Sequence, residues 1–282
     1  MYTPIIKWVG GKTQIMANIL SKFPLEMNNY YELFIGGGSV LLSMLELVNN
    51  GKIKINEKIY AFDVNIELIS MYNNIKNKPL EMFEIIDYMK NEMNKGKSNT
   101  EKEKYYYTLR DFYNKIQDRT SIECSALFIF LNKTCFRGIY RVSKNGFNVP
   151  YGNNKNPEII NKEHIISLSK ILQPVIFSVL SYKDSILLIK KKDFCYLDPP
   201  YMPISRTSFT KYTIGDFTEL DHKTLFTMCD RIPTYFVMSN SDSDLVKQYF
   251  PLDKYYIESL ICKRKINNST AQELIICKRF VE

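Results

Sequence analysis

Asp198-Pro199-Pro200-Tyr201 combines an acid, two rigid residues and an aromatic ring at the end of an apolar run, 193–198. The amine of an aromatic base is a poor nucleophile because its lone pair is delocalised into the ring. A carboxylate at Asp198 and the carbonyl of Pro199 can each accept one N–H of such an amine and draw the pair back onto nitrogen. Pro-Pro fixes that loop, and Tyr201 offers a face for stacking. The alternative interpretation is a rigid loop without chemistry.

A second candidate site follows the apolar run 30–34, where Gly36-Gly37-Gly38 precedes a helical pattern. Gly36 and Gly38 fit the dinucleotide fingerprint, but its third glycine is replaced by Leu41, which weakens a nicotinamide interpretation. Asp63 ends the next predicted strand, 58–65, where an acid can bind a ribose diol. These residues favour an adenosine-type cofactor, although Asp63 could instead cap the helix that begins at Val64.

The stretch KWVGGKTQ at 7–14 contains Gly11-Lys12-Thr13, which resembles the end of a phosphate-binding loop. Such a loop needs another glycine five residues before that tripeptide, and Ile6 occupies that position. It also needs a preceding strand, for which too few residues are available. The sequence therefore argues against a nucleoside triphosphate site and favours another use for these glycines and lysines.

Composition indicates an intracellular globular protein with a polyanionic partner. The 282 residues include 38 lysines and arginines against 30 acids, for a net charge of +8, which favours nucleic acid without proving it. The six cysteines show neither C-x-x-C pairs nor a nearby histidine at metal-ligand spacing, so we expect reduced thiols and no metal. No signal pattern or apolar run of membrane-spanning length is present, which predicts a cytoplasmic location.

The order of elements predicts an α/β protein with a doubly wound parallel sheet. Strand-and-helix alternation covers the start of the chain and resumes with an apolar run after a helix at 161–172, which Asn161 could cap. Between them, 79–131 is mostly helical, the polar stretch 94–104 predicts a solvated loop, and 134–152 predicts a hairpin. We therefore expect a catalytic domain of residues 1–65 and 166–282, interrupted by an insertion of residues 66–165.

Five motifs occur in an order that resembles the Dam-type DNA adenine methyltransferases, over nearly the whole chain. The motifs are KWVGGK (7–12), ELFIGGGSV (32–40), FDVN (62–65), LNKTCFRGIYRVSKNGFNVPYG (131–152) and LDPPY (197–201). The resemblance implies a Rossmann-like methyltransferase sheet, S-adenosylmethionine as cofactor and a target-recognition role for the insertion. It also implies direct transfer of the methyl to the adenine amine, without a metal or a covalent intermediate.

The resemblance also implies which residues bind the cofactor. Lys12 is expected to face the cofactor carboxylate, Asp63 to take the ribose and Asp184 to lie near the adenine, although Asp184 could equally cap a helix at 185–191. The complete expected cofactor set is Trp8, Gly10, Gly11, Lys12, Phe34, Gly36, Gly38, Ser39, Asp63 and Asp184, and the catalytic set is Asp198, Pro199, Pro200 and Tyr201.

For double-stranded DNA, the resemblance implies base flipping and a GATC target. Arg141 is expected to bind a guanine through O6 and N7. The other implied DNA contacts are Lys7, which reaches toward the target, Phe136, which inserts into the helix, and Ile139 and Pro150, which lie near a thymine methyl. Arg137 departs from the family, where asparagine is common, and this puts the contact to the opposite base in doubt. Phosphate contact and a solvated charged face are equal alternatives for Arg110, Arg119, Lys133 and Lys144.

Three functional alternatives remain. Methyltransferases of RNA or of a protein amide use a related catalytic sequence, usually with asparagine in place of Asp198, and a DNA-binding module could keep the fold without catalysis. His164 and His222 are the chain's two histidines, and both are interpreted as structural. A monomer suffices for one flipped base, and a companion restriction endonuclease is a possible partner that the sequence does not establish.

Overall fold

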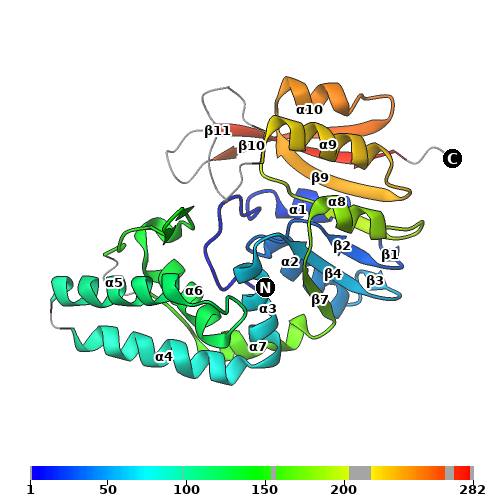
Figure 1. Cartoon of the computed structure of the whole chain (residues 1–282). Coiled ribbons are helices and arrows are strands. Elements are labelled where there is room, and N and C mark those ends of the chain that lie inside the picture. Colours follow the sequence, from blue (N-terminus) through cyan, green and yellow to red (C-terminus); the bar gives the residue numbers. More distant parts are fainter. Residues whose placement is uncertain (1, 97, 154–156, 203–216, 264–269, 280–282) are drawn as a thin grey trace.

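The computed structural model describes residues 2–96, 98–153, 157–202, 217–263 and 270–279. A seven-stranded sheet forms its centre, with the order β10-β11-β9-β8-β2-β4-β7 (Figure 1). Five of these strands run parallel to one another: β7, β4, β2, β8 and β9. At one edge, β11 pairs antiparallel with β9, and β10 pairs antiparallel with β11. The expected α/β class with a mostly parallel sheet is confirmed. The strands of this sheet are Tyr30–Glu32 (β2), Ile59–Asp63 (β4), Val175–Val179 (β7), Phe194–Leu197 (β8), Tyr235–Ser241 (β9), Tyr255–Lys263 (β10) and Thr270–Lys278 (β11).

Successive residues of the central strands enter two different hydrophobic cores because side chains alternate between the two faces of a sheet. In β2, Tyr30 belongs to one core and Tyr31 to the other. The first core also contains residues of Met16–Leu20 (α1), Ser39–Asn49 (α2), Ile66–Asn77 (α3) and Lys162–Leu172 (α7). The second contains residues of Tyr182–Ser185 (α8), Glu219–Asp230 (α9) and Asp244–Tyr249 (α10). Helices therefore cover both faces of the sheet.

The insertion consists of Pro79–Lys95 (α4), Asn99–Lys115 (α5), Ile122–Thr134 (α6) and a short hairpin of Val142–Ser143 (β5) and Gly146–Phe147 (β6). α6 is buried along nearly its whole length and contacts α3, α4 and α5, which makes it the central helix of this part. In Figure 1 these helices lie below and to the left of the sheet. The remaining elements are the two-stranded sheet of Glu26–Met27 (β1) with Lys54–Ile55 (β3), and two 3-10 turns, Phe136–Gly138 (η1) and Ile186–Leu188 (η2).

Two local predictions are wrong. The polar stretch 94–104 is not a loop throughout, because α5 begins at Asn99. The Ser98 hydroxyl accepts the Glu101 N–H, and the Glu101 carboxylate accepts the Ser98 N–H, so a capping box stabilises the start of this helix. The charged composition of the stretch had indicated a loop instead. The predicted helix 185–191 is also misplaced: Ser181 caps the short α8, and η2 follows it.

Other predictions hold. Asn161 caps α7 by accepting the His164 N–H at 2.9 Å. All six cysteines are free and buried. Among the described helices, none has the length and apolar character needed to cross a membrane.

Candidate active site and DNA interface

The sheet brings the two candidate motifs together at its switch point. β2 pairs with β4 on one side and with β8 on the other. From β2 the chain adds β4 and then β7 on one side of the sheet, and later adds β8 and then β9 on the other, so the strand order reverses between β2 and β8. Ligands of open α/β sheets bind beyond the carboxyl ends of the strands at such a point. The glycine loop after β2 and Asp198 after β8 follow these two ends. The fold thus makes neighbours of motifs that lie far apart in the sequence.

Asp198 is an acid with one occupied and one open oxygen. Its Oδ2 lies 2.7 Å from Nζ of Lys12, and its side chain is 20% exposed. Its Oδ1 is buried and has no hydrogen-bond partner among the residues that the structure describes. Burial raises the pKa of Asp198 to about 6, Lys12 opposes this rise, and the charge of Glu273 adds to it. A buried acceptor without a partner is costly, so Oδ1 is suited to a donor from a ligand.

Lys12 and Tyr201 complete the surroundings of this acid. Lys12 is 3% exposed, donates to the Gly10 carbonyl and lies 4.7 Å from the centre of the Tyr201 ring. The Tyr201 hydroxyl donates to Glu273 of β11 at 2.9 Å, which fixes the direction of the ring. Glu273 was not identified from the sequence, because an acid in a late strand gives no signal for this contact. Pro199 is buried and Pro200 is exposed, so this loop reaches the surface at Pro200.

A second buried acid, Glu32, ends β2 beside the same site. It is 2% exposed and accepts the Tyr30 hydroxyl at 2.7 Å. Burial raises the pKa of Glu32 to about 8, and the charge of Asp198 contributes to the rise. Burial therefore favours the neutral form of Glu32 over the charged form beside Asp198.

The glycine loop is packed so closely that side chains would not fit. Gly36 and Gly38 have φ of 47° and 71°, in the left-handed region that favours glycine. A Cβ on Gly37 would lie 2.7 Å from Cβ of Trp8, and one on Gly38 would lie 2.6 Å from the Tyr72 hydroxyl. The N-terminal segment, dark blue in Figure 1, thus packs directly on the loop after β2.

Asp63 lies at the end of β4 beside this loop. Its Oδ2 accepts the Gly36 N–H at 3.1 Å, and its Oδ1 accepts the Asn65 N–H at 2.9 Å. Burial raises the pKa of Asp63, and these backbone donors oppose the rise. The N-cap of α3 is Asn65, which accepts the Leu68 N–H, so Asp63 is not that cap. Each of its oxygens keeps a lone pair for a further donor.

The other expected cofactor residues are spread around the loop. Phe34 stacks with Tyr182 at a centroid distance of 5.8 Å, and Ser39 is the first residue of α2. Asp184 is exposed and accepts the Ser181 hydroxyl at 2.6 Å in the first turn of α8. Asp184 therefore stabilises the start of a helix, as the alternative to an adenine contact predicted. The helix is α8, however, and not the predicted helix 185–191. Gly10 has φ of 87°, and Gly11 is exposed.

A buried asparagine joins the N-terminal segment to η1 within the motif at 131–152. Asn132 of α6 accepts the Lys7 N–H at 2.8 Å and donates to the Lys7 carbonyl at 2.9 Å and to the Gly138 carbonyl at 3.1 Å. Gly138 has φ of 67°, and a Cβ there would lie 2.5 Å from Cδ of Lys7. Lys7 and this loop are thus positioned as one unit. Asn132 was not identified from the sequence, because no local pattern distinguishes it from the other polar residues of the motif.

The expected DNA contacts gather on η1 and the hairpin. Phe136 is 44% exposed, and the Arg137 guanidinium lies 5.0 Å from the centre of its ring. Arg137 has φ of 58°, an uncommon conformation for a residue with a side chain. Nε of Arg141 donates to Asn148 at 2.7 Å, and the Pro150 carbonyl accepts the Phe136 N–H at 2.8 Å. Ile139 is half-buried and packs on the core.

An aromatic stack links this interface to the glycine loop. Tyr140, which follows Ile139, is 8% exposed and stacks with Trp8 at a centroid distance of 5.2 Å and with Phe147 at 5.8 Å. Trp8 in turn packs on Gly36 and Gly37. Tyr140 was not identified from the sequence, because its role depends on a contact with the distant N-terminal segment.

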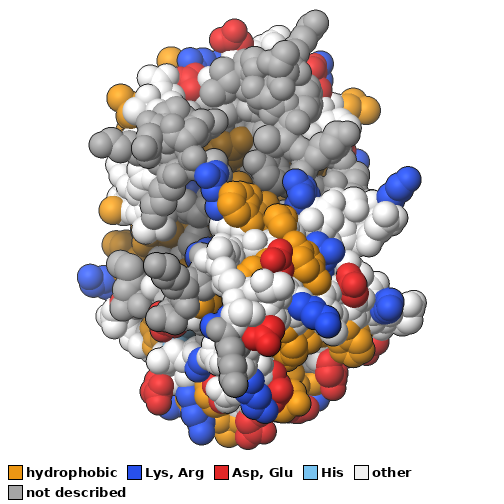
Figure 2. Space-filling model, turned by 90° about the vertical axis from the view of Figure 1, so that its left-hand side faces the viewer, with side chains coloured by type: hydrophobic (Ala, Val, Ile, Leu, Met, Phe, Trp, Pro, Cys, Tyr) orange, Lys and Arg blue, Asp and Glu red, His pale blue; other side chains and the backbone are white. Residues whose placement is uncertain are grey.

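The four additional basic residues differ in their surroundings. Arg119 bonds Glu67 at 2.9 Å through Nη2 and the Tyr113 carbonyl at 2.7 Å through Nη1, so its guanidinium serves the fold. Burial lowers the pKa of Lys133, and nearby Lys7 lowers it further. The guanidinium of Arg110 lies over the Tyr107 ring, and Lys144 is exposed. Figure 2 shows basic, acidic and hydrophobic side chains interspersed over this end of the molecule.

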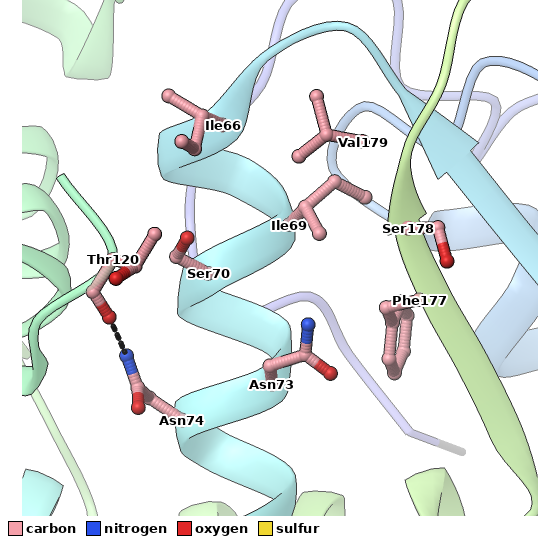
Figure 3. Close-up of a pocket in the computed structure, with 9 residues that line it drawn as sticks. All are labelled: Ile66, Ile69, Ser70, Asn73, Asn74, Thr120, Phe177, Ser178 and Val179. Carbon is pink, nitrogen blue, oxygen red and sulfur yellow. Dashed lines mark hydrogen bonds between the residues drawn. The ribbon is translucent and has the colours of Figure 1, made fainter.

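A separate pocket of about 360 Å³ lies between α3 and β7 (Figure 3). Ile69, Ser70 and Asn73 line it from α3, and Phe177 and Val179 from β7. None of its lining residues belongs to the expected cofactor, catalytic or DNA-binding sets. In the described parts of the chain, no three His, Cys, Asp or Glu side chains gather as a metal site.

A doubly wound sheet with a glycine loop and an acid-proline-proline-tyrosine loop at its switch point defines an α/β protein whose ligands bind beyond the carboxyl ends of β2 and β8. The family model of the D12 class N6 adenine-specific DNA methyltransferases matches residues 8–264, and the chain belongs to this family. It is an adenine-specific DNA methyltransferase, as the sequence predicted, with DNA as its substrate.

Several curated relatives are similar over most of their length. A type II methyltransferase, M.MjaIII of Methanocaldococcus jannaschii, is 35% identical over 276 residues, covering 94% of this chain and 92% of the relative. M1.LlaDCHI of Lactococcus lactis subsp. cremoris, also named a type II methyltransferase, is 34% identical and covers 88% and 84%. A DNA adenine methylase of Salmonella typhimurium is 29% identical and covers 95% and 91%.

Proposed function

We propose that the protein methylates N6 of adenine in GATC sites of duplex DNA, with S-adenosylmethionine as donor and the target base flipped out of the helix. The observation that carries this proposal is Asp198, whose buried Oδ1 has no partner in the described chain and lies beyond β8 at the switch point. An adenine amine brings the donor that this acceptor lacks, and Tyr201 offers a ring beside it.

The glycine loop suits S-adenosylmethionine because its backbone is not covered by side chains and lies beside the acid Asp63. Gly36 and Gly38 adopt positive φ, and Asp63 keeps lone pairs for ribose hydroxyls. Val64 follows Asp63 and is 60% exposed, which gives an apolar surface for an adenine ring. The proposed binding residues are Trp8, Gly10, Gly11, Phe34, Gly36, Gly38, Ser39, Asp63 and, as the least supported, Asp184. When bound, this cofactor supplies a methyl made electrophilic by its sulfonium.

The residues of the D-P-P-Y loop orient and activate the amine. Asp198 Oδ1 and the Pro199 carbonyl accept its two N–H groups, which favours a pyramidal nitrogen with a directed lone pair. Pro200 limits the movement of this loop, and Tyr201 stacks on the base. Because the nitrogen gives up one proton as it gains the methyl, Asp198 Oδ1 can hold that proton before it passes to water. Most of the rate enhancement then comes from proximity and charge.

Flipping the adenine costs a few kcal/mol of unstacking and unpairing, which contacts of the insertion must offset. Phe136 is exposed on η1 and suits insertion into the gap. The Asn148 side chain accepts from Nε of Arg141 at 2.7 Å, and the Asn148 carbonyl accepts from Nη2 at 3.5 Å. Binding O6 and N7 of a guanine would use Nη1 together with Nη2, which gives up this long bond. Ile139 and Pro150 supply apolar contacts to a thymine methyl, and Lys7 approaches the target from the N-terminal segment.

Arg137 is the residue on which the GATC proposal depends most. Its guanidinium lies over the Phe136 ring, so both side chains would enter the helix together. Arginine is longer than asparagine and carries a charge, so its partner at the base opposite the flipped adenine is a carbonyl oxygen or a phosphate. This change favours the same target with a different contact to the unpaired base.

We further propose a catalytic domain of residues 1–65 and 166–282 and a recognition insertion of residues 66–165. α3 contacts both β7 and α6, so this helix belongs structurally to both parts. Because two relatives carry the name type II methyltransferase, we include a restriction endonuclease of the same site as partner. One flipped base needs one active site, which supports a monomer.

The test is transfer of labelled methyl from S-adenosylmethionine to two short duplexes, one with GATC and one with the four bases scrambled. We expect label on adenine N6 of the GATC duplex alone and none with Asp198→Ala. Label on both duplexes would overturn the GATC assignment, and Arg137→Asn would then show whether Arg137 relaxes the specificity. A target base that stays stacked, measured with 2-aminopurine at the adenine position, would overturn base flipping.

A further inference from the structure

Lys12 contacts three parts of the active site at once. Its ammonium lies 2.7 Å from Oδ2 of Asp198, donates to the Gly10 carbonyl and lies 4.7 Å from the centre of the Tyr201 ring. The side chain is 3% exposed, so these contacts are made away from water. The resemblance predicted a different role, in which Lys12 faces the cofactor carboxylate.

We propose that Lys12 is a positioning residue for Asp198: it holds Oδ2 and thereby leaves Oδ1 as the acceptor for the target amine. This inference rests on the role of Asp198 in the proposed function. An ammonium has three N–H donors. The contacts of the ammonium with Asp198, with the Gly10 carbonyl and with the face of the Tyr201 ring use all three donors. Lys12 could therefore bind a cofactor carboxylate only by giving up one of these contacts.

The division between the two oxygens explains why one of them is open. A free aspartate turns about χ2, and its two oxygens exchange places. An ion pair at Oδ2 stops this rotation, because the ammonium is itself fixed by the Gly10 carbonyl. Oδ1 then keeps one direction in the site, as preorganised electrostatic stabilisation of a developing charge requires. The pair is buried, so water screens it little.

Lys12 also decides the charge of the acid. The titratable groups that act on Asp198 or are acted on by it come from four elements of the described chain: Lys12 from the N-terminal segment, Glu32 from β2, Tyr196 from β8 with Tyr201 just after it, and Glu273 from β11. Lys12 is the cation of this set, whereas Glu273 is an anion that opposes ionisation of Asp198. Without Lys12, Asp198 would keep a proton to higher pH, and the protonated acid is a poorer acceptor for the target amine.

The chain contains a natural control for this contact. Lys22 lies 2.7 Å from Oε2 of Glu258 and 4.8 Å from the centre of the Tyr256 ring, almost the same geometry as Lys12 with Asp198 and Tyr201. It lies in the turn after α1 and pairs with β10, away from the switch point, and its side chain is 24% exposed. Lys22→Met therefore removes an equivalent ion pair without touching the proposed site.

The experiment compares Lys12→Met, Lys12→Gln, Lys12→Arg and Lys22→Met in two measurements. The first is kcat/KM for the duplex between pH 5 and 9. The second is the dissociation constant of S-adenosylmethionine without DNA, followed by the fluorescence of Trp8, the chain's one tryptophan. Thermal melting checks folding of each variant, and Lys12→Gln keeps the test possible where Lys12→Met does not fold.

We expect the acidic limb of kcat/KM to move up by about one pH unit or more in Lys12→Met and Lys12→Gln, with activity at pH 7 reduced about tenfold or more. Lys12→Arg should keep the position of the limb, since it keeps the cation. Cofactor affinity should change by less than about threefold in all of them, and Lys22→Met should behave as the wild type in both measurements.

Two results would overturn the inference. One is an unchanged acidic limb in Lys12→Met, and the other is a loss of cofactor affinity of about tenfold or more, which would make Lys12 a cofactor ligand. Failure of the proposed function gives a different result, because Asp198→Ala would then retain activity whatever the Lys12 variants do. With Asp198→Ala inactive and the limb of Lys12→Met unchanged, Lys12 alone loses its assigned role.

Discussion

Asn132 provides the most direct test of how the DNA interface is attached to the active site. Replacing it with leucine keeps a similar volume but removes all three of its hydrogen bonds, two to Lys7 and one to Gly138. Asn132 is 1% exposed, so water does not replace these bonds. At about 1 kcal/mol for each bond, and more where a buried group is left unpaired, we expect a loss of about 3–4 kcal/mol in the free energy of unfolding.

The functional effect should exceed what instability alone explains. Lys7 and Gly138 lose their common anchor, so the proposed DNA contacts on either side of it lose their fixed positions. We expect kcat/KM for the duplex to fall by more than about tenfold at a temperature where the variant remains folded, because small displacements of positioning contacts are costly. Urea unfolding followed by circular dichroism gives the stability, and labelled methyl transfer gives the rate.

Asn74→Leu is the matched control. Asn74 of α3 also makes three bonds, to the carbonyls of Thr120 and Ser121 and to the Ser125 hydroxyl, but it lies at the α3–α6 contact instead of the interface. This variant should lose stability while kcat/KM stays within about twofold of the wild type. An Asn132→Leu protein with full kcat/KM, or one as stable as the wild type, would refute the argument.

Three further predictions concern single residues. Gly138→Ala should cost about 1–2 kcal/mol in urea unfolding and weaken duplex binding in a titration, because its φ is positive and its Cβ would meet Lys7. Burial lowers the pKa of His222 to about 4, below about 6.5 in the unfolded chain, so stability should fall by about 2–3 kcal/mol between pH 7 and 4.5, and His222→Leu should remove this dependence. Arg119→Gln should cost about 1–3 kcal/mol through loss of the Glu67 pair while the salt dependence of DNA binding stays unchanged; a slope lower by about one would make Arg119 a phosphate contact.

The sequence predicted best those features that depend on near neighbours. The strand ending at Asp63 agrees with β4, and the run ending at Asp198 agrees with β8 to within one residue at each end. Apolar runs that end on an acid are local patterns, so their position in a parallel sheet follows from the period and from the turns. The capping box of α5 was also local, but its polar and charged residues at 98–104 were interpreted as a loop.

The contacts that complete the site could not be predicted in this way. Asn132, Tyr140 and Glu273 act on residues that lie far from them in the chain, and each belongs to a residue type that is common in ordinary helices, loops and strands. Their roles depend on the order of the strands and on where the insertion packs. No periodicity or spacing encodes that placement, which is why motif order indicated the family while the supporting residues required the structure.

The N-terminal motif that looked like a phosphate loop has a physical explanation in these contacts. Within six residues, Lys7 is anchored to the proposed recognition loop through Asn132, Trp8 packs on the glycine loop, and Lys12 holds Asp198. A lysine whose ammonium is buried against Asp198 cannot also neutralise a triphosphate, because each donor serves one acceptor. Gly10 serves another purpose: its φ of 87° lets this short segment turn between its contacts with the three sites. An insertion or deletion within the segment, which displaces all three contacts, should therefore affect DNA binding, cofactor binding and the pH dependence together, whereas replacement of one contact residue, such as Lys12→Met, should affect mainly its own site.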